Sequence, residues 1–461
     1  MKKIIVFTSV LLVLSITSVI YVCGSVNDEA GNVRYDIVDL YGNRSAAYGA
    51  QINVNYEHAG NMFWETNILI DKEDTVISEF NFRYSNRQQG EIHYSGITPY
   101  SSMHYSLNRN DPNATGLNKA YKEIYDSTPF GTEKTVTVKI ADYYEYYPVS
   151  VTIHIPGFSY RSFDTVNDSG YQSVASKEIT KTFNEFFKIP VSDKDTIDIT
   201  VDRDESDGMS SNTIHTNFYN LASDSVLGKK TCYIYIANSN NDNSIADTSL
   251  IPGGYGIYAI EYGSEYEYGI DLTSLRTVFP LPENESVRKI CLNEDRSLMY
   301  VFTSTKTNGY VYTIDTNSFT LLEKLKTEIP IYYHITVGDG FFLLYGDENI
   351  EVIAIESSGL CRSALCVKSA YHVDNTFHDL FVSASADFYG DKLVCVDHLH
   401  EGRFRSLELC SFYVSVYDKS GLIYYGEYNC SLSANPNSAS YSYNCLPSNI
   451  DYIDVKWLKS K

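Results

Sequence analysis

Three carboxylates that could hold a metal ion lie close together in one polar run, at Asp202, Asp204 and Asp207. Their oxygens are hard donors of the kind that Ca²⁺ prefers. The run differs from an EF-hand loop, because Ser206 holds the fifth position and Gly208 comes one residue late. The sequence therefore leaves two interpretations open, a Ca²⁺ site or a solvated acidic loop, and it predicts no other cofactor.

A second candidate metal site is the pair His398 and His400, which are separated by one residue. Side chains two residues apart in a strand point to the same face, so both rings could reach one ion. A His-x-His pair can hold Zn²⁺, but zinc also needs a third ligand from elsewhere in the chain. The sequence does not identify that ligand.

Tyrosine is unusually frequent, with 41 copies, and it is dense at Tyr143, Tyr144, Tyr146 and Tyr147. Exposed tyrosine rings stack on sugars and peptides, and their hydroxyl groups add specific hydrogen bonds. We expect these residues to form a strand, in which alternate rings face opposite sides and one side packs in the core. The cluster therefore indicates either a ligand-binding platform or aromatic packing.

No catalytic residue is predicted, because the chain contains no GxSxG nucleophile elbow, no HExxH zinc motif and no GxxxxGK[ST] phosphate loop. A glycosidase, however, requires only two carboxylates about 5–10 Å apart, and no motif announces them. With 58 acidic residues, the sequence leaves that alternative open.

The elements that must position these residues are short runs in which apolar and polar residues alternate, the pattern of half-buried strands. In the second half of the chain the runs come in sets, separated by turn residues such as those at 307–309 and 418–421. One run of each set ends in an acid, and these acids recur roughly every 40 to 60 residues. They are Glu261, Asp315, Glu356 and Asp418.

Sets of four strands with a period of about 40–50 residues are typical of propeller blades. Over residues 220–430 the pattern resembles the irregular β-propellers grouped with YVTN, WD40-like and quinoprotein-like repeats, although neither the Trp-Asp dipeptide nor the Tyr-Val-Thr-Asn motif occurs. The resemblance implies an all-β fold, a propeller of seven or eight irregular four-stranded blades over 33–461. The alternative is a separate β domain at 33–220 followed by propeller-like repeats at 221–461. Helical spacing is found in 174–187, which also fits a strand.

The N-terminus predicts export. Two lysines precede nineteen uncharged residues, and the run ends at Cys23 in a sequence that resembles a bacterial lipobox, except that Val22 stands where a small residue is usual. We expect residues 1–22 to be a signal peptide or signal anchor and 23–32 a tether. A lipid anchor at Cys23, an uncleaved signal anchor and ordinary secretion all remain open, and each places the rest of the chain outside the membrane.

Charge and cysteine content limit the partners. A net charge of −22 opposes phosphate backbones and anionic lipid, so we expect no nucleic acid and no membrane contact beyond the N-terminal anchor. Eight of the nine cysteines lie between Cys232 and Cys445, and they fit either disulfides or buried thiols.

These features together predict an anchored extracytoplasmic protein that binds an envelope protein or a glycan without chemistry. Two other functions stay open. One is a carbohydrate-active hydrolase or lyase of propeller fold, and the other is an accessory to an envelope signalling system. Fold class alone does not separate them.

Overall fold

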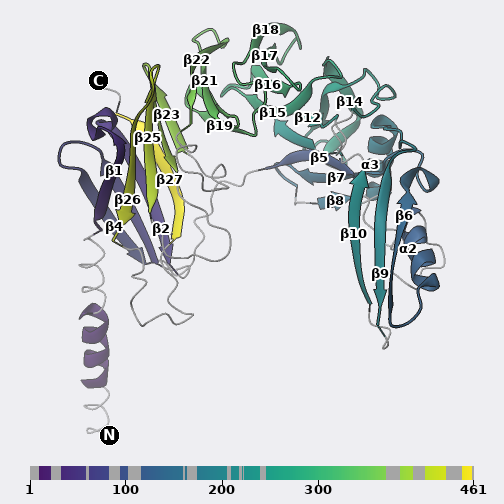
Figure 1. The fold of residues 1–461 in the computed structure, drawn as a ribbon, viewed down its shortest axis with the longest axis horizontal. Helices are drawn as coiled ribbons and strands as arrows, with labels where there is room; N and C mark the ends of the chain where they lie inside the picture. The colour runs from purple at the N-terminus through teal and green to yellow at the C-terminus, as the bar shows by residue number, and fades with distance from the viewer. Residues whose placement is uncertain are drawn as a thin grey trace. The chain divides into compact units, whose positions relative to one another are not determined.

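The computed structural model divides into two compact units, Met1–Glu91 with Thr327–Lys461, and Ile92–Lys326 (Figure 1). We refer to them as the first and second unit. The residues that the structure describes are 10–21, 33–58, 62–82, 94–101, 116–158, 161–163, 174–204, 209–217, 221, 223–238, 245–369, 385–397, 411–431 and 449–458.

Four sets of four strands, each in chain order, form antiparallel sheets between residues 223 and 430. Two of these sheets belong to the second unit and two to the first. The first sheet of the second unit consists of β11 (Ser223–Leu227), β12 (Thr231–Ile236), β13 (Gly256–Tyr262) and β14 (Ile270–Pro280). Its second sheet consists of β15 (Ser286–Leu292), β16 (Leu298–Ser304), β17 (Gly309–Asp315) and β18 (Leu321–Lys326). The first-unit sheets are β19 (His334–Gly338), β20 (Phe341–Tyr345), β21 (Asn349–Ile355) and β22 (Cys361–Lys368), and β23 (Ser385–Tyr389), β24 (Lys392–Asp397), β25 (Phe412–Asp418) and β26 (Gly421–Cys430).

The predicted repeat is confirmed in these four sheets, because each repeated acid lies at or next to the end of the third strand. Two of the acids have a local reason to be there. The Asp315 carboxylate accepts hydrogen bonds from the backbone N–H groups of Asn317 and Ser318, at 3.0 and 2.7 Å, and Asp418 accepts one from Ser420 at 2.7 Å. Such side-chain bonds stabilise the tight turn that leads into the fourth strand.

A further sheet in the first unit joins the two ends of the chain, in the order β27-β2-β3-β4. A separate strand, β1, pairs antiparallel with β26 and becomes the fifth strand of the β23–β26 sheet, which we call sheet A. Sheet A and the β27 sheet share one apolar core. The bounds are β1 (Tyr35–Gly42), η1 (Arg44–Ala47), β2 (Ala50–His58), β3 (Met62–Leu69), β4 (Thr75–Phe82) and β27 (Asn449–Trp457).

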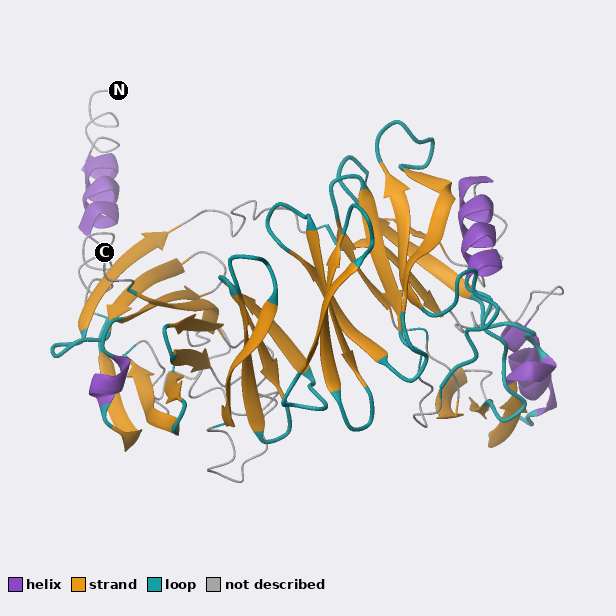
Figure 2. Ribbon diagram, turned by 90° about the horizontal axis from the view of Figure 1, so that it is seen from above, coloured by secondary structure: helices purple, strands orange, loops and turns teal. Residues whose placement is uncertain are grey.

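The rest of the second unit departs from a regular set of four-stranded sheets. It contains two three-stranded sheets, β5-β7-β8 and β10-β9-β6, together with helices α2 and α3 (Figure 2). Their bounds are β5 (Gly96–Ser101), α2 (Gly116–Ser127), β6 (Thr132–Lys139), η2 (Ile140–Asp142), β7 (Val149–His154), β8 (Arg161–Phe163), α3 (Val174–Phe186), β9 (Thr196–Arg203) and β10 (Met209–Asn217).

The all-β prediction is therefore correct only as mostly β. The segment 174–187, which fitted a helix or a strand, contains α3, whereas α2 was not predicted. Helix α2 buries Leu117, Tyr121 and Ile124 on one face, at the spacing of an amphipathic helix. Lysines and acids fill its other face and reduce its mean hydropathy, which is why its period did not stand out beside the strands.

In the second unit, a buried carboxylate holds the segment before β15 against the sheet. The Glu285 side chain accepts hydrogen bonds from Thr303 Oγ1 at 2.8 Å and Tyr312 OH at 2.6 Å, and it pairs with Lys324 Nζ at 2.7 Å. Thus one acid joins three successive strands, β16, β17 and β18. Because Glu285 is itself buried, these partners are what make its burial tolerable.

Glu351 makes a similar connection in the first unit, but here the acid lies in a strand and its backbone partners lie in the segment before the sheet. It lies in β21, and its Oε2 accepts hydrogen bonds from the backbone N–H groups of Glu328 and Ile329, at 2.9 and 3.0 Å, just before β19. Ser363 donates to its Oε1 at 2.7 Å. Burial raises the pKa of this carboxyl above its usual range.

Replacing Glu285 with alanine should destabilise the second unit by about 3 kcal/mol, because two buried hydroxyl groups and a cation lose their acceptor at once. The matched control is Glu294→Ala in the exposed turn before β16, which should change stability by less than about 0.5 kcal/mol. Urea unfolding followed by far-ultraviolet circular dichroism measures both values. Equal midpoints for the two variants would show that the Glu285 contacts contribute nothing net.

Candidate functional site

The tyrosine cluster does not form the predicted strand. It follows η2 and has one isolated bridge, between Tyr146 and Pro190. Tyr147 is buried and donates a hydrogen bond to the buried carboxylate of Asp195. The hydroxyl group of Tyr144 accepts a hydrogen bond from the backbone N–H of Leu117, at 3.2 Å, in the first turn of α2.

The other two rings of the cluster, Tyr143 and Tyr146, are half-buried. Tyr143 packs against the core of the second unit, and its hydroxyl group lies 3.5 Å from Glu123 of α2. The ammonium group of Lys188 is 5.8 Å from the centre of the Tyr146 ring. These contacts connect the cluster to α2 and to the 189–195 segment. Any binding role for the cluster stays a prediction.

The predicted metal ligands are only partly within the described residues. Asp202, in β9, and Asp204, just after it, are both exposed, whereas Asp207, His398 and His400 lie outside the described residues. Among the residues that the structure describes, no group of three or more His, Cys, Asp or Glu side chains is placed to hold a metal ion.

The cysteines in the described ranges are free thiols, and most are buried. They are Cys232, Cys291, Cys361, Cys366, Cys395 and Cys430, of which only Cys366 is exposed. Burial raises the pKa of both Cys232 and Cys395 to about 12, so these two thiols stay protonated and unreactive at neutral pH.

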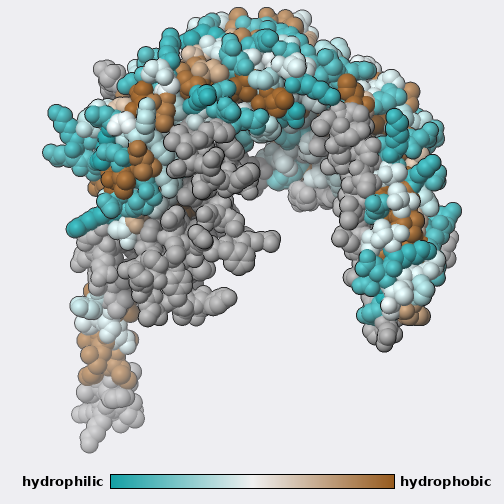
Figure 3. Space-filling model, in the orientation of Figure 1, coloured by the Kyte–Doolittle hydropathy of each residue, from teal (hydrophilic) through white to brown (hydrophobic). Residues whose placement is uncertain are grey.

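The proposed lipidation residue, Cys23, also lies outside the described residues. Before it, residues 10–21 are helical and their large apolar side chains are exposed, which Figure 3 shows as a brown stretch. Of the helices within the described ranges, none is both long enough and apolar enough to cross a membrane.

The strongest candidate site is one face of sheet A, where a row of four cross-strand neighbours runs from an exposed edge to a buried acid. Val38 of β1 pairs with Glu427 of β26, Glu427 with Tyr413 of β25, and Tyr413 with Asp397 of β24. Paired residues in antiparallel strands share a face, so these four side chains lie side by side. We call them the acid row.

A second row lies beside the acid row on the same face and contributes an aromatic surface. The Tyr413 and Tyr425 rings are stacked, with centroids 5.6 Å apart and planes at 15°. Tyr413 OH also donates a hydrogen bond to Glu427, at 3.3 Å. Toward β24 the face becomes apolar and packs against the β19–β22 sheet through Cys395 and Tyr417.

Asp397 is the unusual member of the acid row, because it is a carboxyl group with 2% of its surface exposed. Burial raises its pKa to about 8, and none of the described residues provides a cation to offset that cost. Its near neighbour across the sheet interface is the buried Tyr345, whose own pKa is raised well above its usual value, mainly by burial. Asp397 is therefore protonated at neutral pH.

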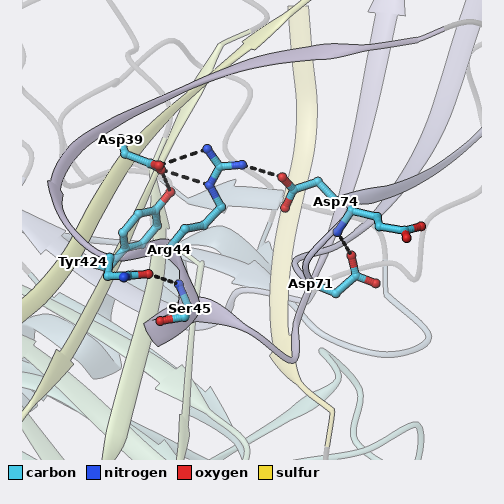
Figure 4. A network of polar contacts seen from close by, with 8 residues as sticks. Asp39, Arg44, Ser45, Asp71, Asp74 and Tyr424 are labelled. Atoms are coloured by element: carbon cyan, nitrogen blue, oxygen red, sulfur yellow. Dashed lines mark hydrogen bonds and ion pairs between the residues drawn. The ribbon is translucent and has the colours of Figure 1, made fainter.

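At the exposed end of the acid row, an arginine holds β1 in place (Figure 4). Arg44, in η1, donates two hydrogen bonds to the Asp39 carboxylate of β1, from Nε and Nη2 at 3.0 Å each. Its Nη1 donates to Asp74, in the turn between β3 and β4, at 2.5 Å. These bonds lower the pKa of Asp39. We call Arg44, Asp39 and Asp74 the arginine clasp.

Sheet A supplies a third contact to the clasp. Tyr424 OH donates to Asp39 Oδ1 at 2.9 Å. Its ring lies over Gly426, where an added Cβ would come within 2.1 Å of the Tyr424 hydroxyl. At the end of β1, Gly42 has φ +73°, and a Cβ there would meet the carbonyl oxygen of Ile423. Both glycines let the chain approach closely where β1 turns into η1.

The edge that the clasp holds exposes three large apolar side chains. Val38 is 41% exposed, Leu40 49% and Tyr41 57%. Single exposed apolar residues are ordinary, but three within four positions of an edge strand form a patch. Within the described residues, β1 is an edge strand that offers both apolar side chains and one side of its backbone to solvent.

None of these residues was selected from the sequence as part of a site. The alternating run 392–397 was recognised, and its period of two places Cys395 and Asp397 on one face. An acid at the end of such an apolar run is a sequence signal that could have identified Asp397 as a candidate. The pairing of β1 with β26, almost 400 residues apart, leaves no trace in a single sequence.

No family model matches the chain, and no curated protein matches it. Solved structures that resemble it include the Dos1 propeller, at 11% identity and a TM-score of 0.27, covering 63% of this chain and 76% of that one. The N-terminal domain of Nup159 has 8% identity and a TM-score of 0.28 and covers 80% and 69%. The periplasmic gluconolactonase PpgL of Pseudomonas aeruginosa has 13% identity and a TM-score of 0.25 and covers 81% of both. Because these TM-scores are low, the description of the fold rests on the sheets of this chain and not on the similar structures.

Proposed function

We propose that this protein is an anchored, extracytoplasmic binding module, a scaffold for an envelope protein, built as a closed propeller of seven or eight blades. The observation that carries the binding role is the exposed apolar edge of β1. A side chain held in one conformation loses little entropy on binding, and the arginine clasp fixes the strand that carries these side chains.

The proposed anchor would keep this edge near the membrane. Between Cys23 and β1 there are eleven residues, which span at most about 40 Å when fully extended. A partner that meets Leu40 and Tyr41 would then be embedded in the same membrane or bound at its surface. An acidic protein is repelled by anionic lipid, so the anchor supplies the attachment and β1 the recognition.

The test is a photo-crosslinking amino acid at Leu40 in the full-length protein, expressed in its native envelope. We expect a discrete crosslinked species from Leu40 and none from Ile77, an exposed apolar residue on β4, an edge strand of the β27 sheet. Cys23→Ala should release the protein from the membrane fraction and weaken the crosslink. Equal crosslinking from both positions would contradict the proposal, and unchanged fractionation of Cys23→Ala would contradict the lipid anchor alone.

A carbohydrate-active enzyme is the second candidate, and the acid row favours it. Asp397 and Glu427 lie two strands apart, a Cα separation of roughly 10 Å, with Tyr413 between them. A protonated acid beside an ionised one is the pairing that glycosidases use. The burial of Asp397 places this function second, because a substrate must reach the acid. Hydrolysis of an envelope polysaccharide that is lost in Glu427→Gln would reverse the order.

A further inference from the structure

We infer that the partner binds by adding a strand to the free edge of β1, and that this strand carries positive charge. The inference rests on the proposed binding function and specifies how the contact is made. Strand addition uses main-chain hydrogen bonds for affinity and alternate side chains for specificity.

The backbone of β1 is satisfied on one side. Seven residues of β1 pair with β26, from Tyr35 opposite Cys430 to Gly42 opposite Tyr424. In an antiparallel pair, alternate residues direct both their N–H and C=O groups to the same side, so about half of the strand faces away from β26. Most of β1 is exposed, including every residue from Val38 to Gly42.

The usual devices that protect an edge are mostly missing from β1. Natural edge strands carry proline, lysine or an inward charge, or are very short. This strand has eight residues with neither proline nor lysine. Its protective features are a bulge between Asp39 and Tyr41 and the charges of Asp36 and Asp39. The stretch before the bulge, which includes Val38, therefore forms the docking segment.

Charge decides which strand would bind. Asp36 is exposed on β1, Glu427 lies next to Val38 across the pair, and the whole chain carries a net charge of −22. A second copy would bring another −22 to the same edge, and like charges facing each other across a pair are destabilising. A strand that alternates apolar and basic residues would place its cations on the face that carries Asp36, Val38 and Glu427. Its apolar side chains would then lie on the opposite face, beside Ile37.

The experiment uses two fluorescein-labelled octapeptides, one alternating valine and lysine and the other alternating valine and glutamate. Fluorescence anisotropy with the wild-type protein should show binding of the basic peptide and none of the acidic one. Val38→Lys should weaken the basic peptide at least tenfold, whereas Ile77→Lys, with the same charge change on β4, should stay within twofold. The two tryptophans, Trp64 and Trp457, both lie in the first unit and report whether each variant is folded.

Four outcomes would overturn the inference. Equal binding of both peptides would remove the charge argument, and unchanged binding by folded Val38→Lys would remove β1 as the docking edge. A wild-type dimer in sedimentation that Val38→Lys dissociates would identify a second copy as the occupant. If crosslinking at Leu40 persists while the basic peptide fails to bind, the proposed binding function stands and strand addition does not.

Discussion

Replacing Asp397 with asparagine should abolish a loss of stability that the wild-type first unit shows as pH rises from about 5 to 8. The cause is the buried, protonated carboxyl group, whose pKa is about 8 in the folded protein. In the unfolded chain the same group has an ordinary pKa of about 3.9. Between these values the folded protein holds a proton that the unfolded chain has released.

The sign follows from this difference in bound protons. Because the folded state binds more protons than the unfolded state, the free energy of unfolding falls as pH rises, by up to about 1.4 kcal/mol per pH unit. The loss is complete near pH 8, where Asp397 becomes charged in the folded protein as well. Asparagine is neutral throughout, so the stability of the variant relative to wild type should rise by about 3–4 kcal/mol between pH 5 and pH 8.

Guanidinium unfolding at several pH values, followed by tryptophan fluorescence, measures the effect selectively, since Trp64 and Trp457 both report on the first unit. The matched control is Asp418→Asn, also in sheet A. Asp418 is only half-buried, and hydrogen bonds from Ser420 lower its pKa, so its titration lies below this range. Parallel curves for wild type and Asp397→Asn between pH 5 and 8 would mean that Asp397 is ionised in the folded protein.

The parts of the fold that were predicted from sequence are those with a local signal. Alternation and turn residues located fourteen of the sixteen strands of the four regular sheets in outline, because each strand pairs with its neighbour in the chain, whereas β11 and β23 were not identified. The pairing of β1 with β26 and of β2 with β27 joins the two ends of the chain. No local pattern carries such pairing, because register between distant strands depends on the tertiary core.

The candidate site was missed for the same reason. Its members come from β1, β24, β25 and β26, and their chemistry depends on burial that a sequence does not show. Asp397 ends a run that resembles those ending in Asp315 and Asp418, yet those two are only half-buried and Asp397 is buried. For the tyrosine cluster the sequence left both binding and packing open; the structure shows packing contacts for its rings, and a binding role stays a prediction.

The second large effect is expected from Arg44→Met, which should destabilise the first unit by about 2–3 kcal/mol. Methionine keeps most of the apolar stem but removes the guanidinium donors from Asp39 and Asp74, so that Asp39 keeps only the Tyr424 hydroxyl as a donor. Breaking a buried ion pair costs about 3–5 kcal/mol, and the partial exposure of all three side chains reduces that value. One oxygen of Asp74 is already buried without a hydrogen bond in the structure, so the loss of Arg44 leaves both of its oxygens unsatisfied.

The loss of stability in Arg44→Met should appear mainly in β1. Hydrogen exchange of the backbone amides should accelerate in β1 more than in β24 and β25, because Arg44 ties β1 to the β3–β4 turn and the inner strands keep their own neighbours. The control is Arg276→Met, which removes an exposed pair with Glu261, 3.9 Å apart, and should cost less than about 0.5 kcal/mol. Uniform acceleration across sheet A would contradict a local clasp. If β1 alone loosens, the basic peptide should bind less well to Arg44→Met, because a mobile edge must be ordered before a strand can add to it.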